Sequence, residues 1–150
     1  MSWQDHINKL MSSNALDGAA IIGLQDAKVY GISKDLSIGV YEALIKDENG
    51  EAKKCTANEA QILVDFCNKK GKVPVPPGIW INKKRYYLLN WRDESNVGYV
   101  KTNQGGACIA KTNKCVIVGV WSNAKIPSRN GGDCNKTVEK VAELFMKVNY

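Results

Sequence analysis

The sequence predicts an α+β fold: a central antiparallel β-sheet covered on one face by an N-terminal and a C-terminal helix, with a short helix elsewhere. Apolar residues recur at steps of three and four near both ends of the chain, which indicates two amphipathic helices. Between these ends the apolar segments are mostly short and separated by polar turns, as in strands. Two helices with short apolar stripes are most economically buried side by side on one sheet face. A length of 150 residues suits a single domain over residues 1–150.

The first predicted elements are a helix and a β-hairpin. Ser2 can cap a helix over residues 3–13 by accepting a hydrogen bond from a free backbone N–H group. Residues 19–25 and 28–33 then form two predicted strands, and the tight connection between them favours an antiparallel pair. The apolar residues of the helix fall on one face: Trp3, Ile7, Leu10 and Met11.

Residues 34–54 allow two interpretations. Asn49-Gly50 is a strong hairpin-turn dipeptide, and residues 40–46 and 51–54 on either side of it would then pair as strands. A mobile loop is the alternative interpretation of this segment, whose pattern is the least distinct in the chain.

The next segment is predicted to be a short helix. Thr56 and Glu59 have the spacing of a capping box, which makes Thr56 the expected N-cap, and Gly71 ends the helix. Prolines in residues 72–78 prevent regular strand pairing, so we predict an extended connector there. A short polyproline ligand for another protein is the alternative for this segment.

The second half of the chain is predicted to be rich in strands and to end in a helix. A tight turn at Thr112-Asn113 joins the last two strands. The final helix follows Gly131-Gly132 and runs to Tyr150, with Asp133 or Asn135 as its N-cap. The strand candidates are residues 79–81, 85–91, 98–101, 107–111 and 115–121. The apolar face of the final helix consists of Val138, Val141, Ala142, Phe145 and Val148.

The composition favours a soluble binding protein over an enzyme. His6 is the only histidine, so no second histidine is available for a Ser-His-Asp or Cys-His set. The five cysteines include no Cys-x-x-Cys pair, which predicts free thiols in a reducing cytosol and no metal or other cofactor. No apolar run is long enough to span a bilayer. A net charge of +6 favours acidic partners: a protein face, phosphoinositide head groups or nucleic acid.

Four segments, in order and spacing, resemble the profilin family. They are SWQDHINKLM and DGAAIIGLQD near the start, and GGACIAKTNKCVIVGVW and GGDCNKTVEKVAELFMKVNY near the end. The exception is residues 34–54, where profilins usually have a much shorter connection; this one resembles the extended loop of divergent profilins, such as those of archaea. The resemblance implies a cytoplasmic, cytoskeleton-associated monomer that binds monomeric actin and regulates filament assembly. We expect residues 34–54 to leave the sheet near the terminal helices and to modulate actin contact.

The resemblance also implies three sets of binding residues. The actin-facing set is Arg85, Tyr87, Lys101, Asn103, Arg129, Asn130, Asn135, Lys136 and Lys140. A groove for proline-rich peptides would lie between the terminal helices and contain Trp3, His6, Tyr30, Leu144 and Tyr150. Phosphoinositide lipids would bind Lys83, Lys84, Arg85 and Lys111, with Lys101 and Lys136 as further basic positions.

The groove residues depart from the family pattern at three positions. Tyr30 stands where a tryptophan is usual, His6 where a tyrosine is common, and Leu144 where histidine or tyrosine is expected. Since an aromatic contact contributes about 0.5–1.5 kcal/mol beyond its buried area, these changes would lower the affinity about tenfold or more. We therefore expect weak or absent binding of proline-rich proteins.

Other interpretations remain open at this point. A small trafficking scaffold of the longin or roadblock type also combines a sheet with helices, and it typically dimerises by sheet extension. A nucleic-acid-binding protein would need exposed aromatic residues interleaved with its Lys and Arg positions, whereas the aromatic residues here mostly fall in predicted buried strands, so we expect no nucleic-acid partner. Ordinary solvent-facing polarity would also explain any single residue of the actin-facing set.

Overall fold

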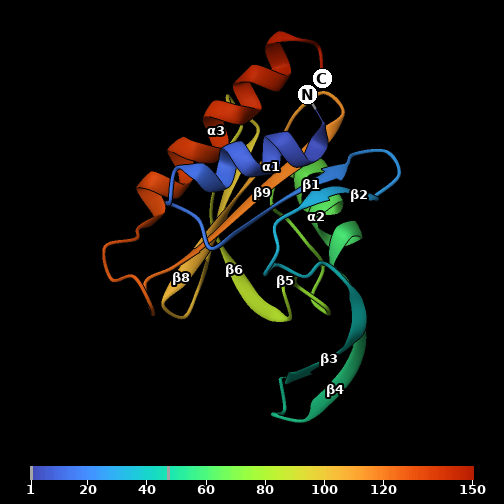
Figure 1. Cartoon of the computed structure of the whole chain (residues 1–150). Coiled ribbons are helices and arrows are strands. Elements are labelled where there is room, and N and C mark those ends of the chain that lie inside the picture. The colour runs from blue at the N-terminus through green and yellow to red at the C-terminus, as the bar shows by residue number, and fades with distance from the viewer. Residues whose placement is uncertain (1, 47) are drawn as a thin grey trace.

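The computed structural model describes residues 2–46 and 48–150, and its elements are labelled in Figure 1. The helices found in these residues are α1 (Trp3–Ser12), α2 (Glu59–Asn68) and α3 (Gly131–Lys147). The strands are β1 (Gly18–Gly23), β2 (Val29–Ile32), β3 (Val40–Lys46), β4 (Ala52–Asn58), β5 (Ile79–Ile81), β6 (Lys84–Arg92), β7 (Val97–Thr102), β8 (Gly105–Lys111) and β9 (Cys115–Ser122). No helix in the described part of the chain is long and apolar enough to cross a membrane.

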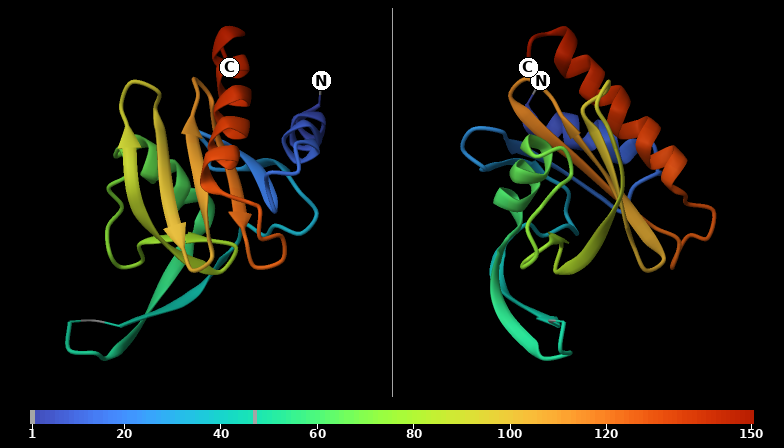
Figure 2. Two further views of the ribbon diagram at one scale, coloured as in Figure 1. Left: turned by 90° about the vertical axis from the view of Figure 1, so that its left-hand side faces the viewer. Right: turned by 180° about the vertical axis from the view of Figure 1, so that it is seen from behind.

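Seven of the strands form one antiparallel sheet in the order β2-β1-β9-β8-β7-β6-β5. Helices α1 and α3 lie on one face of this sheet, and α2 lies against the other (Figures 1 and 2). Side chains alternate along β8: Cys108 and Ala110 point to the terminal helices, whereas Ala107 and Ile109 point to α2. The predicted α+β fold, with both terminal helices on one sheet face, is confirmed.

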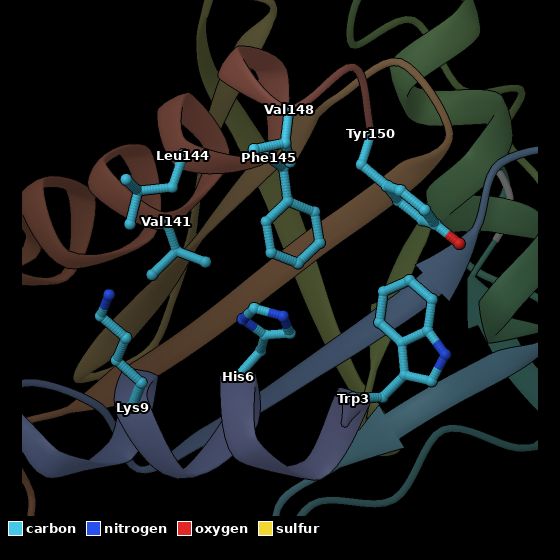
Figure 3. Close-up of a pocket in the computed structure, with 8 residues that line it drawn as sticks. All are labelled: Trp3, His6, Lys9, Val141, Leu144, Phe145, Val148 and Tyr150. Carbon is cyan, nitrogen blue, oxygen red and sulfur yellow. The ribbon is translucent and has the colours of Figure 1, made fainter. Parts of the chain in front are cut away.

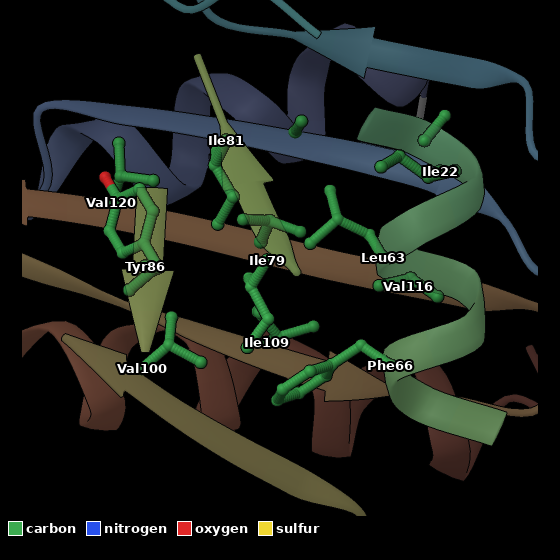
Figure 4. Close-up of a cluster of buried hydrophobic side chains, with 14 of the residues drawn as sticks. Ile22, Leu63, Phe66, Ile79, Ile81, Tyr86, Val100, Ile109, Val116 and Val120 are labelled. Atoms are coloured by element: carbon green, nitrogen blue, oxygen red, sulfur yellow. The ribbon is translucent and has the colours of Figure 1, made fainter. Parts of the chain in front are cut away.

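The sheet therefore separates two hydrophobic cores. The core beneath α1 and α3 contains Ile7 and Phe145 among its buried side chains. The core beneath α2 is centred on Leu63 and Phe66 (Figure 4). Phe66 lies so close to the sheet that a Cβ atom at Gly98 would come within 2.3 Å of its ring, so this position in β7 requires glycine.

The start of α1 agrees with the sequence prediction, whereas the start of α3 does not. The hydroxyl of Ser2 accepts a hydrogen bond from the backbone N–H of Asp5, and the Asp5 carboxylate accepts one from the backbone N–H of Ser2. The N-cap of α3 is Asn130, whose side chain accepts a hydrogen bond from the N–H of Asp133. The predicted caps Asp133 and Asn135 are wrong, because α3 begins earlier, at the glycine pair itself.

The predicted cap of α2 is also wrong. Thr56 belongs to β4, where it lies opposite Glu42, and Asn58 is the N-cap of the helix. Glu59 turns inward and is 0% exposed. The capping-box pattern failed here because strand pairing continued past Thr56 and occupied its backbone.

Strands β3 and β4 form a β-hairpin that is separate from the main sheet. The strong turn signal at Asn49-Gly50 thus predicted the hairpin correctly. Glu59 fixes its base: its carboxylate accepts hydrogen bonds from the N–H of Gly39, the hydroxyl of Tyr41 and the N–H of Lys83. The hairpin projects away from α1 and α3 at the opposite end of the molecule (Figures 1 and 2). The expectation that it leaves the sheet near the terminal helices was wrong.

Candidate functional site

Strands β6 and β7 present an uncovered surface beside α3. Tyr87 and Lys101 lie directly opposite each other in neighbouring strands. The residues before them, Tyr86 and Val100, point into the core beneath α2, so Tyr87 and Lys101 point to the opposite face of the sheet. Helix α3 packs on β8 and β9 and stops short of this surface. Tyr87 is therefore 62% exposed, and Leu89 on the same strand is 63% exposed. We name the surface formed by Tyr87, Leu89, Lys101, Asn103 and Asn135 the open sheet face.

A hollow of about 460 Å³ lies within the open sheet face. Leu89, Lys101 and Asn103 line its strand side, and Asn135 lines it from α3. Trp121 of β9 forms part of the floor. The indole can lie there because residue 106 is glycine: a Cβ atom at that position would be 2.9 Å from the Trp121 Nε1 atom.

The flank of α3 that borders this hollow is fixed to the sheet. The Tyr99 hydroxyl donates a hydrogen bond of 3.0 Å to the Glu139 carboxylate. Glu139 also lies 4.0 Å from the guanidinium of Arg92. Burial raises the pKa of Tyr99; the bond from Arg92 opposes this shift, and the bond to Glu139 adds to it. Asn135, one helical turn before Glu139 on the same flank, lines the edge of the hollow.

Five members of the predicted actin-facing set lie outside the open sheet face: Arg85 adjoins it at Tyr87, and the other four lie elsewhere. The guanidinium of Arg129 is ion-paired with Asp17 and donates a hydrogen bond of 3.2 Å to the carbonyl of Asn14. Its side chain is only 10% exposed, so it ties the start of α3 to the segment that follows α1. Asn130 is used as the cap of α3. Lys136 shares a second hollow with Arg129, and Lys140 lies one helical turn further along α3, towards α1.

The predicted phosphoinositide residues divide between two ends of the sheet. Lys83 lies in the exposed turn between β5 and β6, and Lys84 and Arg85 are the first residues of β6. The Arg85 guanidinium lies 5.2 Å from the centre of the Tyr87 ring. Lys111 is the last residue of β8, and Gly105, its first residue, lies at the end of the sheet nearer this turn. The six residues of strand from Gly105 to Lys111 span about 20 Å. One head group would therefore not contact all four residues.

The predicted groove between the terminal helices is present (Figure 3). It has a volume of about 580 Å³ and is lined by Trp3, His6, Lys9, Val141, Leu144, Phe145, Val148 and Tyr150, which we name the terminal groove. The ring centres of Trp3 and Tyr150 are 5.2 Å apart. Tyr30 lies behind Trp3, at 4.9 Å between ring centres, and donates a hydrogen bond to Asp26. The structure thus places all five predicted groove residues in or beside one groove.

Tyr150 is held in place by the turn between β8 and β9. Its carbonyl accepts hydrogen bonds from the N–H of Lys114 and the hydroxyl of Thr112. The ammonium group of Lys114 also lies 5.0 Å from the centre of the Tyr150 ring. One wall of the groove is therefore a fixed aromatic ring.

Sequence reasoning missed several residues of these sites. It assigned Phe145 only to the apolar face of the final helix, yet the ring also lines the groove and lies 4.8 Å from His6. It gave no role to Leu89 or Lys9. The available signal for Lys9 was its position, six residues after Trp3 and next to the apolar Leu10.

Comparisons with known proteins agree on one family. The family model named Profilin matches residues 1–150. A curated profilin of Tetrahymena pyriformis is 29% identical over 154 residues, with 99% of this chain and 98% of the relative covered. Among solved structures, profilin IB of Acanthamoeba castellanii matches with a TM-score of 0.74 at 20% identity, over 99% of this chain and 100% of that one. The structure titled as a complex of LokiProfilin1 and rabbit actin matches with a TM-score of 0.67 at 18% identity, over 99% and 98%.

Proposed function

This chain belongs to the profilin family, and from that premise we propose that it binds monomeric actin and regulates the assembly of actin filaments. It acts by binding rather than by catalysis, as a cytoplasmic monomer associated with the cytoskeleton. The solved complex of a structurally similar profilin with rabbit actin supports actin as the partner.

The open sheet face is the observation that carries this proposal. Tyr87 and Leu89 expose apolar surface on rigid strands, and the ammonium of Lys101 stands between them and α3. Lys101 takes part in none of the ion pairs found among the described residues. An apolar centre beside a free cation and amide groups suits a partner with an apolar patch and acidic residues.

The proposed mechanism is occlusion of one end of the actin monomer. A protein that covers one end of an actin monomer prevents addition at that end and leaves the other end free. The net charge of +6 accelerates the encounter with an acidic partner, because long-range attraction raises the association rate at low ionic strength.

We propose two subsidiary activities. Anionic phosphoinositide head groups bind at Lys83, Lys84 and Arg85, and because Arg85 adjoins Tyr87, such binding competes with actin. The terminal groove binds proline-rich peptides weakly, because Trp3 and Tyr150 remain as stacking groups while Leu144 supplies none.

The test is pyrene-actin polymerisation with increasing protein. We expect the wild type to slow assembly. The Lys101→Glu variant should require a protein concentration at least about tenfold higher for the same slowing, because the reversed charge repels an acidic partner. Lys136→Glu should have a smaller effect, since Lys136 lies outside the open sheet face. Lys72→Glu, an exposed residue between α2 and β5, changes the net charge equally and is the matched control. No effect of the wild type on polymerisation would overturn the proposal.

A further inference from the structure

The terminal groove has two chemically different ends (Figure 3). At one end the rings of Trp3 and Tyr150 meet edge to face, with Phe145 beside them. At the other end the wall is aliphatic, formed by Val141 and Leu144 of α3. A ligand made only of proline rings would stack at the first end and find no ring at the second.

The aliphatic end carries a positive charge. Lys9 of α1 lines the groove opposite Val141 and Leu144, and it forms no ion pair with any described residue. Among the residues that line the groove there is no carboxylate side chain. Burial, together with nearby positive charges that include Lys9, lowers the pKa of His6, so the imidazole is neutral near pH 7. Lys9 is then the cation at the aliphatic end of the groove, whereas Lys114 lies at the aromatic end, beside the Tyr150 ring.

We propose that the terminal groove selects a proline-containing segment in which an aliphatic residue and an acidic residue lie beside the proline, the acidic side chain pairing with Lys9. This inference rests on the proposed peptide binding in the groove and names its ligand class. The proline packs on the rings of Trp3 and Tyr150, the aliphatic side chain packs on Leu144, and the carboxylate pairs with the Lys9 ammonium.

The length of the groove sets the spacing within the ligand. Trp3 and Lys9 are six residues apart on α1, which corresponds to about 9 Å along the helix axis. An extended polyproline II segment advances about 3.1 Å per residue, so this span takes about three residues. The acidic residue therefore lies about three positions from the stacked proline, with the aliphatic residue between them.

Calorimetric titration at low ionic strength with three peptides tests this assignment. The first carries the sequence Leu-Glu-Leu between two equal runs of proline, and this symmetric order makes the result independent of the direction in which the peptide lies. The second replaces the glutamate by glutamine, and the third is an oligoproline of equal length. Lys9→Gln is the test variant, and Lys72→Gln is the matched control, because it removes one positive charge far from the groove.

We expect the glutamate peptide to bind about two- to five-fold more tightly than the glutamine peptide, as for a partly exposed ion pair. The glutamine peptide should still exceed oligoproline, since leucine packs on Leu144. Lys9→Gln should remove the preference for glutamate without weakening the glutamine peptide, whereas Lys72→Gln should keep it. Equal binding of the glutamate and glutamine peptides, or a preference that survives Lys9→Gln, would overturn the assignment. Absence of binding by all three peptides would reject the groove as a peptide site, and the actin assay would still test the open sheet face separately.

Discussion

Replacing Glu59 by alanine should release the β3–β4 hairpin from the body of the protein. Glu59 is fully buried, and its carboxylate joins the start of α2 to residues 39–41 and to Lys83, which are far apart in the sequence. It accepts hydrogen bonds of 3.1 Å from the N–H of Gly39 and 2.8 Å from the N–H of Lys83, and a third from the Tyr41 hydroxyl. Burial, followed by the hydrogen bond to Glu59, raises the pKa of Tyr41, which keeps the phenol in its donating form.

The magnitude follows from the donors that would be left behind. A buried donor without an acceptor costs about 1–3 kcal/mol, and water reaches some of the three once the carboxylate is gone. We therefore expect Glu59→Ala to lower the free energy of unfolding by about 3–5 kcal/mol. For a chain of this size that corresponds to a fall in Tm of about 10 °C.

Thermal unfolding measures the loss of stability, and amide hydrogen exchange measures the release of the hairpin. The exchange of the amides in β3 and β4 should accelerate more than that of β8 and β9, because the lost bonds anchor the hairpin rather than the main sheet. Glu42→Ala provides the matched control, since Glu42 is exposed on the outer face of the same hairpin. If Glu59→Ala and Glu42→Ala unfold at the same temperature with the same hairpin exchange, the reasoning is refuted.

Two further predictions concern Gly106 and His6. Gly106→Ala should destabilise the protein by about 1–3 kcal/mol in a denaturant titration and change the fluorescence of Trp121, because the added Cβ would lie 2.6 Å from the Val100 carbonyl oxygen. Gly39→Ala is the control: nothing lies within 4 Å of the added atom, so it should change the stability little in the same titration. The imidazole of His6 should titrate below its ordinary pKa of 6.5 in an NMR pH series, because burial lowers the pKa. Since the unfolded chain then binds more protons, His6 makes unfolding easier as pH falls below 6.5, and a measured midpoint above 6.5 would contradict this.

Local signals in the sequence predicted elements well where no distant segment competed for the same groups. Ser2 caps α1 as expected, and Asn49-Gly50 marks the hairpin correctly. Thr56 and Glu59 carry an equally good local signal, yet β4 occupies the first and three distant donors occupy the second. The sequence pattern alone does not reveal such competition, because it depends on which segments meet in the folded chain.

The candidate sites show the same limit. Arg129 had the charge expected of a residue that meets an acidic partner, but its guanidinium is bound by Asp17, 112 residues earlier in the chain. Leu89 had no distinguishing pattern, since an apolar residue in a strand is ordinarily buried. It is exposed because α3 covers β8 and β9 but not β6, and the sequence does not state how far a helix extends over a sheet.

Helix α3 borders both candidate surfaces, and this shared border links them physically. One flank of α3 presents Asn135 and Glu139 to the open sheet face, and the opposite flank presents Leu144 to the terminal groove. The helix is fixed at its start by Arg129 and at its end by the contacts of Tyr150 with the turn between β8 and β9. Charges such as Lys101 and Lys9 belong to one surface each and can be varied separately. A change at either anchor of α3 displaces both walls at once, so a loss of both activities in an anchor variant reports the position of the helix rather than contact with either partner.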